Sequence, residues 1–343
     1  MASGRSHPRG SLGPAAARVW PGSPGSGPGG PLYAGRVPHI AYLGPAGTFT
    51  EQATRQLTEG FGAELVPFDT VPLALDAVRR GEVLAAGVPV ENSVEGSVNA
   101  TLDALTVDDP LVAVQEALLP VQFDLLVRPG TELAGIRTVA SHPHALAQVR
   151  GWLAENLPDA EVRATGSTSA GAAAVAAGEF DSAIAAPVAL EHYPSLERLV
   201  GGIADVRDAV TRFLLVRRPG QLPEPTGADR TSLCAVISDE VGTLAEMLTE
   251  LSLRGINLSR IESRPIKDRF GEYRFFLDFD GHVADARIGD ALTALRRRCS
   301  SVRFLGSYPK ADRTPASVRP SASEQAFRSS AQWVEDVRAG RLA

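Results

Sequence analysis

Four short polar turns hold the residues of this chain whose types and spacing suit chemistry. Each turn follows an apolar run that suits a strand and precedes a pattern that suits a helix. The turns are Gly44–Glu51, Glu91–Ser97, Ser141–Gln148 and Ser167–Ser169. Backbone N–H groups at the start of a helix lack partners and attract anions. Together, the four turns predict a site for a small anionic ligand.

Neutral polar side chains dominate these turns. They offer the hydroxyl and amide groups of Thr48, Asn92, Ser93, Gln148, Thr168 and Ser169. Arg212 follows Thr211 at the start of a strong strand pattern, and a guanidinium can hold a carboxylate through two parallel hydrogen bonds. Such a set positions a ligand and stabilises charge, so it suits a reaction that needs little covalent help.

The sequence lacks the patterns that mark several other kinds of site. The sequence contains no Gly-rich phosphate loop, no Gly-x-Ser-x-Gly elbow and no Cys–His pair for nucleophilic catalysis. His142 and His144 form half a metal site at most, since no carboxylate cluster flanks them, and we expect neither a metal nor a cofactor. The only two cysteines, Cys234 and Cys299, exclude a disulfide scaffold and suit the reducing cytoplasm.

Charge and hydropathy exclude two classes of partner. The 343 residues include 34 Lys and Arg against 40 Asp and Glu, and a net charge of −6 argues against a nucleic-acid binder. No apolar run reaches the roughly 18 residues of a membrane-spanning helix. Residues 1–36 are rich in Gly and Pro and lack acidic residues, which predicts a disordered extension.

The elements that must position the turns lie in residues 37–217. Short apolar runs alternate there with helical patterns, which predicts an α/β domain with a mainly parallel sheet. The apolar run Leu111–Val127, interrupted by Pro120, suits a crossover between two lobes, and Ala209–Val216 suits a strand that returns to the first lobe. We expect two lobes and a cleft, with the polar turns at the carboxyl ends of the strands.

A smaller block follows a linker. Residues 218–229 are rich in Pro and Gly, which marks the linker. Residues 230–309 show the order strand, helix, strand, strand, helix, strand, which is the ferredoxin-like βαββαβ arrangement. Residues 310–343 begin with a polar stretch, and we expect them to form a mobile tail with a short helix around Ala326–Val337.

Six segments, taken in order, resemble the prephenate dehydratase family. They are GPAGTFTE (Gly44–Glu51), PVENSVEGSV (Pro89–Val98), SHPHALAQ (Ser141–Gln148), STS (Ser167–Ser169), TRF (Thr211–Phe213) and ESRP (Glu262–Pro265). The last lies in the second block, which resembles an ACT regulatory domain, although its segment Gly242–Leu244 departs from the commoner Gly-Ala-Leu. The resemblance covers about residues 38–308, and no chorismate mutase helices precede it, which implies the monofunctional form.

The resemblance implies a two-lobed, periplasmic-binding-protein-like catalytic domain with a C-terminal ACT domain. It implies a carbon–oxygen lyase that converts prephenate into phenylpyruvate, CO₂ and water in L-phenylalanine biosynthesis. It also implies allosteric inhibition by L-phenylalanine and a homodimer or homotetramer. Two alternatives stay open: an arogenate dehydratase, which acts on the aminated analogue, and a non-catalytic amino-acid sensor, since two-lobed clefts also serve as solute-binding modules.

The resemblance also assigns roles to single residues. Thr211 is the essential hydroxyl, a positioned hydrogen-bond donor to the leaving group, and Arg212 binds a substrate carboxylate. The other catalytic residues, which orient the substrate, are Asn92, Ser93 and Gln148. Further substrate contacts are expected from Thr48, Thr168, Ser169 and Phe213. L-phenylalanine is expected to contact Gly242, Leu244, Glu262, Ser263, Arg264 and Pro265.

Overall fold

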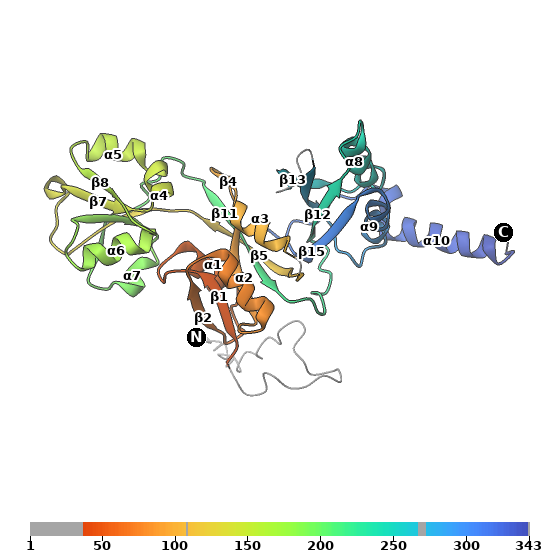
Figure 1. Cartoon of the computed structure of the whole chain (residues 1–343), viewed down its shortest axis with the longest axis horizontal. Helices are drawn as coiled ribbons and strands as arrows, with labels where there is room; N and C mark the ends of the chain where they lie inside the picture. Colours follow the sequence, from red (N-terminus) through yellow and green to blue (C-terminus); the bar gives the residue numbers. More distant parts are fainter. Residues whose placement is uncertain (1–36, 108, 267–271, 342–343) are drawn as a thin grey trace, which may run out of the picture.

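Figure 1 shows a computed structural model of the chain, which describes residues 37–107, 109–266 and 272–341. Two lobes and a third unit follow one another along the longest axis of the molecule. The predicted extension of residues 1–36 lies outside the described residues. None of the described helices is long and apolar enough to cross a membrane.

The first lobe is built on a mixed sheet. Its strands are β1 (His39–Leu43), β2 (Glu64–Phe68), β3 (Ala85–Asn92), β4 (Gly96–Ser97), β5 (Val112–Pro120) and β11 (Val210–Arg217). Strand β1 is parallel to β2 and β3, whereas β11 is antiparallel to both β3 and β5. The prediction of a mainly parallel sheet is wrong here. The chain re-enters this lobe at the carboxyl end of β3 and therefore runs back along it.

Three helices accompany this sheet: α1 (Phe49–Leu57), α2 (Val71–Arg80) and α3 (Asn99–Leu105). The start of α1 shows why its turn is rigid. The Thr48 hydroxyl accepts from the backbone N–H of Glu51 at 3.4 Å, and the Glu51 carboxylate accepts from the N–H of Gly47 at 2.6 Å. This pairing of hydroxyl and carboxylate fixes the backbone that carries Thr48.

The second lobe has a five-stranded sheet in the order β10-β6-β9-β7-β8. Its strands are β6 (Asp124–Val127), β7 (Thr138–Ser141), β8 (Glu161–Ala164), β9 (Ser182–Ala185) and β10 (Glu197–Val200). Its helices are η1 (Leu133–Gly135), α4 (Pro143–Gln148), α5 (Arg150–Asn156), α6 (Thr168–Ala176) and α7 (Ala189–His192). The chain crosses between lobes after β5 and again before β11, which confirms the predicted two-lobed organisation.

The third unit has the predicted βαββαβ order. Its elements are β12 (Asp229–Ile237), α8 (Thr243–Leu253), β13 (Leu258–Pro265), β14 (Tyr273–Asp280), α9 (Ala286–Arg298) and β15 (Ser301–Pro309). Apolar side chains of α8 and α9, among them Met247 and Ile288, pack in one cluster with Leu233 and Leu277 of the sheet. These apolar side chains form a stripe along one side of each helix, and each stripe is buried against the sheet.

The chain beyond β15 forms η2 (Pro320–Ala322) and α10 (Glu324–Arg338), which projects from the third unit (Figure 1). This helix contains the predicted segment Ala326–Val337. The start of the predicted tail is anchored to the body, since Lys310 is buried with its Nζ 3.3 Å from Asp280 Oδ1.

One feature was not predicted: the sheet of the third unit continues into the sheet of the first lobe. Strand β15 lies parallel to β5, with Gly306 opposite Ala113, and gives the strand order β13-β14-β12-β15-β5-β11-β3-β1-β2. Gly306 has φ 142°, and a Cβ at this position would overlap the carbonyl oxygen of Ala113. The close approach of the two strands therefore requires glycine.

Replacing Gly306 with alanine should weaken this junction. We expect Gly306→Ala to lower the free energy of unfolding by about 2–4 kcal/mol, because backbone strain and overlap with the neighbouring strand add. Gly227→Ala is the matched control, since Gly227 has φ 81° but open space around it. Thermal or denaturant unfolding compares the two variants, and equal losses would contradict a role for the strand contact.

Candidate active site

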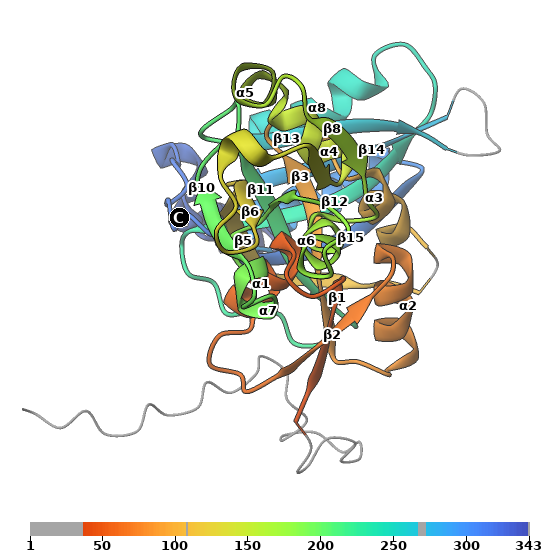
Figure 2. The same ribbon diagram turned by 90° about the vertical axis from the view of Figure 1, so that its left-hand side faces the viewer.

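A cleft of about 430 Å³ lies between the two lobes. Figure 2 looks onto the second lobe, with α4 and α6 toward the viewer and the strands of the first lobe behind. All four polar turns contribute residues to the walls of the cleft. The structure thus brings together five residues of the predicted set: Thr48, Asn92, Gln148, Thr168 and Thr211.

Thr211 and Asn92 form the best-defined pair in this cleft. They lie opposite each other in the β11–β3 ladder, and Asn92 Nδ2 donates to Thr211 Oγ1 at 2.8 Å. The amide cannot be reversed, because Asn92 Oδ1 already accepts from the N–H groups of Val94 at 2.8 Å and Glu95 at 3.0 Å. Since the amide occupies an acceptor position of the hydroxyl, the proton of Thr211 remains available for a ligand in the cleft.

Glu95 bridges the two lobes at this cleft, and sequence analysis missed it. Its Oε1 accepts from Gln148 Nε2 at 2.6 Å, and its Oε2 lies 2.5 Å from His144 Nδ1. Glu95 belongs to the segment PVENSVEGSV, but its partners come from α4, some fifty positions along the chain. Only the approach of the two lobes shows that this carboxylate holds the cleft together.

His142 lies beside this bridge, with its ring centroid 5.0 Å from that of His144. Burial is the main cause that lowers the pKa of His142, and the neighbouring His144 lowers it further, whereas Glu95 opposes both. His142 is therefore mostly neutral at pH 7, since an ordinary histidine pKa is about 6.5.

Two helix starts from opposite lobes face the cleft. Helix α1 begins after Thr48, and α6 begins at Thr168 after Ser167, whose hydroxyl accepts from the N–H of Ala170 at 2.9 Å. The partial positive charges at these ends favour a ligand with negative charge at both walls, although the Thr48 hydroxyl itself donates to the carbonyl of Pro45 at 3.0 Å.

An aromatic pair adds an apolar wall. The rings of Phe49 and Phe123 meet edge to face, with centroids 5.4 Å apart and planes at 84°. Phe49 opens α1, and Phe123 lies in the first crossing between the lobes. Both line the cleft, so it offers a ring-sized apolar surface next to its polar turns. Sequence analysis did not select these phenylalanines.

Three residues predicted to contact the substrate do not line this cleft. Phe213 is 1% exposed in the core of the first lobe. The Ser169 hydroxyl donates to the carbonyl of Ala46, which joins α6 to the first lobe. The Ser93 hydroxyl accepts from the N–H of Val210 at 2.9 Å and so fixes the start of β11. These three side chains stabilise the backbone around the cleft and do not face the cleft itself.

Arg212 also points away from the cleft. Side chains alternate along a strand, so Arg212 lies on the face of β11 opposite Thr211. Its Nε is 2.5 Å from Glu116 Oε1, its Nη1 is 2.5 Å from Asp278 Oδ2, and its Nη2 donates to Tyr308 Oη at 2.8 Å. The geometry does not support the expectation that Arg212 binds a substrate carboxylate, because two protein carboxylates already neutralise it.

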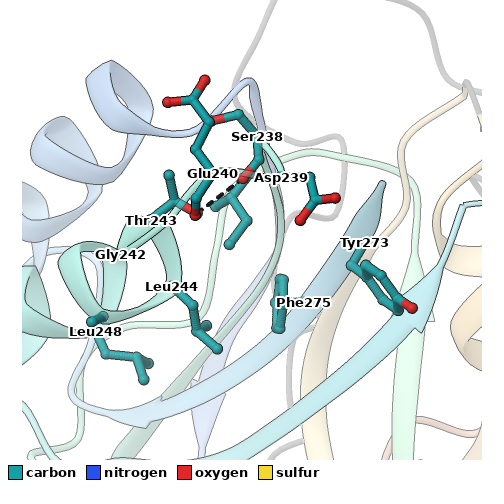
Figure 3. Close-up of a pocket in the computed structure, with 11 residues that line it drawn as sticks. Ser238, Asp239, Glu240, Gly242, Thr243, Leu244, Leu248, Tyr273 and Phe275 are labelled. Atoms are coloured by element: carbon teal, nitrogen blue, oxygen red, sulfur yellow. Dashed lines mark hydrogen bonds between the residues drawn. The ribbon is translucent and has the colours of Figure 1, made fainter. Parts of the chain in front are cut away.

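A second pocket, of about 520 Å³, lies in the third unit at the start of α8 (Figure 3). Gly242 and Leu244 of the predicted effector set line it. Leu248 and Phe275 complete an apolar wall, and the carboxylates of Asp239 and Glu240 stand at the polar end. Such a pocket suits a small molecule with an apolar side chain and a cationic group.

The rest of the predicted effector set lies on β13 and does not line this pocket. Glu262 Oε2 accepts from the Ser97 hydroxyl at 3.0 Å, and Arg264 Nη2 is 3.2 Å from Asp103 Oδ1, so both side chains contact the first lobe. Ser263 and Pro265 lie on the exposed face of the strand. Within one chain, the structure therefore divides the predicted set between a pocket and a domain boundary.

No group of three or more His, Cys, Asp or Glu residues is placed to hold a metal ion within the described parts of the chain.

Comparison with known proteins gives a consistent result for both the two-lobed part and the third unit. Two family profiles match, one described as prephenate dehydratase over residues 40–221 and one as ACT domain over residues 235–297. A prephenate dehydratase from Amycolatopsis methanolica is 62% identical over 305 residues, which cover 89% of this chain and 99% of the relative.

Two solved structures are similar throughout. The structure of a prephenate dehydratase in complex with L-Phe, from Arthrobacter aurescens, has a TM-score of 0.83 and 46% identity, and covers 88% of this chain and 99% of that one. A protein described as GqqA, a quorum quenching acylase, has a TM-score of 0.71 and 31% identity, and covers 79% of this chain and 97% of that one.

Proposed function

The chain belongs to the prephenate dehydratase family and carries a C-terminal ACT domain, and we propose that its interlobe cleft is the site of catalysis. The family activity is that of a carbon–oxygen lyase. Prephenate loses its ring carboxylate as CO₂ and its ring hydroxyl as water, and the aromatic ring of phenylpyruvate is formed. The observation that carries the assignment of the site is the Thr211–Asn92 pair, which offers a positioned proton inside the cleft.

Thr211 assists the departure of the ring hydroxyl in this proposal. As the bond from carbon to the carboxylate breaks, its electrons enter the ring and expel the hydroxyl, which takes up one proton and leaves as water. The Thr211 hydroxyl donates a hydrogen bond to that oxygen, and Asn92 holds the hydroxyl in place. Threonine acts here as a fixed donor to developing negative charge and does not titrate near neutral pH.

The two carboxylates of prephenate are assigned to the helix starts. Arg212 is engaged elsewhere, so the backbone N–H groups at the starts of α1 and α6, together with the Thr168 hydroxyl, supply the anion-binding groups, one set on each lobe. The substrate would then connect the lobes from wall to wall. Phe49 and Phe123 provide the surface against which the ring rests.

The bridge from Glu95 to Gln148 and His144 favours the closed cleft. Closure excludes water from the ring and strengthens each hydrogen bond inside. Gln148 is held by Glu95 through its amide nitrogen, which leaves its carbonyl to orient the substrate.

The ACT pocket is proposed as the site for L-phenylalanine, the effector bound in the Arthrobacter structure. Leu244, Leu248 and Phe275 suit its ring, and the carboxylates of Asp239 and Glu240 suit its ammonium group. Inhibition then follows if the effector binds one arrangement of the ACT domain better than the other.

An open edge of the ACT sheet supports the expected homodimer or homotetramer. Strand β13 is an edge strand of the sheet, and Ile261 and Tyr273 beside it are 44% and 46% exposed. An open edge with apolar neighbours is a surface that a second copy can cover. Cytoplasmic residence stays a prediction, supported by two cysteines that are buried and unpaired.

Two variants of Thr211 test the catalytic proposal. Thr211→Val keeps the shape but removes the hydroxyl, and we expect kcat for phenylpyruvate formation from prephenate to fall by about 10²–10⁴. Thr211→Ser keeps the hydroxyl and should retain activity within about tenfold. A valine variant as active as the serine variant would contradict the role of Thr211. Parallel assays with arogenate separate the two dehydratases, and a wild-type protein inactive on both would favour the sensor.

A leucine pair tests the effector site. Leu244→Asn places an amide in the apolar wall, and we expect the inhibition constant for L-phenylalanine to rise at least about tenfold, since a buried amide without partners is costly. Turnover without effector should be unchanged. Leu253→Asn is the control, because Leu253 lies on the same helix but is 77% exposed. Identical inhibition curves for the two variants would place the effector elsewhere.

A further inference from the structure

A buried ionic cluster joins the first lobe to the ACT domain directly behind the cleft. Arg212 and Glu116 come from the first lobe, and Asp278 and Tyr308 come from the ACT sheet. The side chains of Arg212, Asp278 and Glu116 are 7%, 6% and 1% exposed. Asp278 also accepts from the Ser232 hydroxyl at 2.5 Å, so each of its oxygens has a partner.

Arg212 and Asp278 are both ionised at neutral pH. Burial alone would raise the pKa of Asp278, but Arg212 and Arg260 outweigh it and hold that pKa below its ordinary value. Burial alone would lower the pKa of Arg212, and Asp278, Tyr308 and Glu116 reverse the effect. Desolvation largely offsets the attraction in such a pair, so its main consequence is a fixed geometry that neither partner can leave alone.

Both strands that carry the proposed catalytic pair are held by this cluster. Arg212 is adjacent to Thr211 on β11, and its partner across the ladder is Glu91, which is adjacent to Asn92 on β3. Glu91 Oε2 lies 3.5 Å from Nε of Arg260, which belongs to β13 of the ACT domain. The residue next to each member of the catalytic pair therefore contacts a charged ACT side chain.

The β11–β3 ladder is irregular beside the proposed catalytic pair. The β11–β3 pairing contains an irregularity immediately after Arg212, between Arg212 and Phe213. A cavity of about 240 Å³, lined by Glu91, Arg212 and Arg260, lies beside the contacts. An irregular pairing re-aims the side chains that leave the strand, and the cavity beside it leaves room that tight packing would deny.

We propose that Arg212, held by Asp278, is a positioning residue for Thr211, and that rearrangement of the ACT domain reaches the cleft through this pair. The inference rests on the proposed role of Thr211. It goes beyond the resemblance, which assigned Arg212 to the substrate. A contact between Arg264 and Asp103 also joins the two domains, but it ends on α3, which contributes no residue to the catalytic pair.

Three carboxamide variants of the full chain test this link. Asp278→Asn removes the charge that holds Arg212, and Glu91→Gln removes the carboxylate near Arg260. Asp103→Asn is the matched control, since it neutralises a carboxylate at the same domain boundary away from the catalytic pair. For each variant, turnover of prephenate is measured with and without saturating L-phenylalanine, and binding of L-phenylalanine is measured directly by calorimetry.

Asp278→Asn should lower kcat at least about tenfold with KM within about threefold, because the misplaced hydroxyl acts in the transition state. L-phenylalanine should still bind with nearly unchanged affinity, yet its inhibition at saturation should weaken by a factor within the usual range of about 5- to 150-fold. Glu91→Gln should lower kcat and weaken the saturated inhibition to a smaller extent, because Glu91 is half-exposed. Asp103→Asn should match the wild type in both readouts.

Variants with the kcat and the saturated inhibition of Asp103→Asn would overturn the inference, even if they unfolded at lower temperature. If Asp278→Asn does not fold, Glu91→Gln decides between the same two outcomes. Failure of the proposed function looks different: Thr211→Val would then retain activity, or the wild type would not convert prephenate. An active wild type with an inactive Thr211→Val and normal Asp278→Asn and Glu91→Gln would reject the link alone.

Discussion

The antiparallel return of β11 between β3 and β5 is the constraint on which the rest of the structure depends. This strand completes the second crossing between the lobes, so its position sets the width of the cleft. The alternation of side chains then gives its two faces different tasks. Thr211 meets Asn92 on the cleft side, and Arg212 meets Asp278 on the ACT side. The three consecutive residues Thr211, Arg212 and Phe213 thereby face the cleft, the ACT domain and the core of the first lobe.

For a negatively charged ligand, the described lining of the cleft offers neutral groups and helix starts and no Lys or Arg side chain. Among the described residues that line it, the basic side chains are His142 and His144, and the first of these is mostly neutral. A dianionic substrate bound by fixed dipoles keeps its charge without forming a rigid ion pair. That arrangement fits a reaction in which one carboxylate must leave as a neutral molecule, since a strong ion pair would stabilise the ground state.

Apolar spacing and turn residues predicted most helices and strands, because these elements form from residues that are close together in the sequence. The alternation of strands and helices in both lobes and the βαββαβ order of the third unit followed from apolar spacing and turns. The junction of β15 with β5 could not be predicted in this way, because it pairs residues almost two hundred positions apart. The direction of Arg212 shows a different limit. Alternation separates it from Thr211, but only the packed fold shows which face is the cleft.

The shared sheet has a consequence for how this architecture can change over evolutionary time. Strand β15 lies along β5, so the ACT unit covers what would otherwise be the open side of the catalytic sheet. A gene rearrangement that removed this unit would expose the backbone of β5 around Ala113, and an exposed strand edge promotes association between molecules. It would also leave Arg212 without its ACT partners Asp278 and Tyr308. Loss of the ACT unit would therefore disturb the catalytic sheet as well as remove the regulatory site.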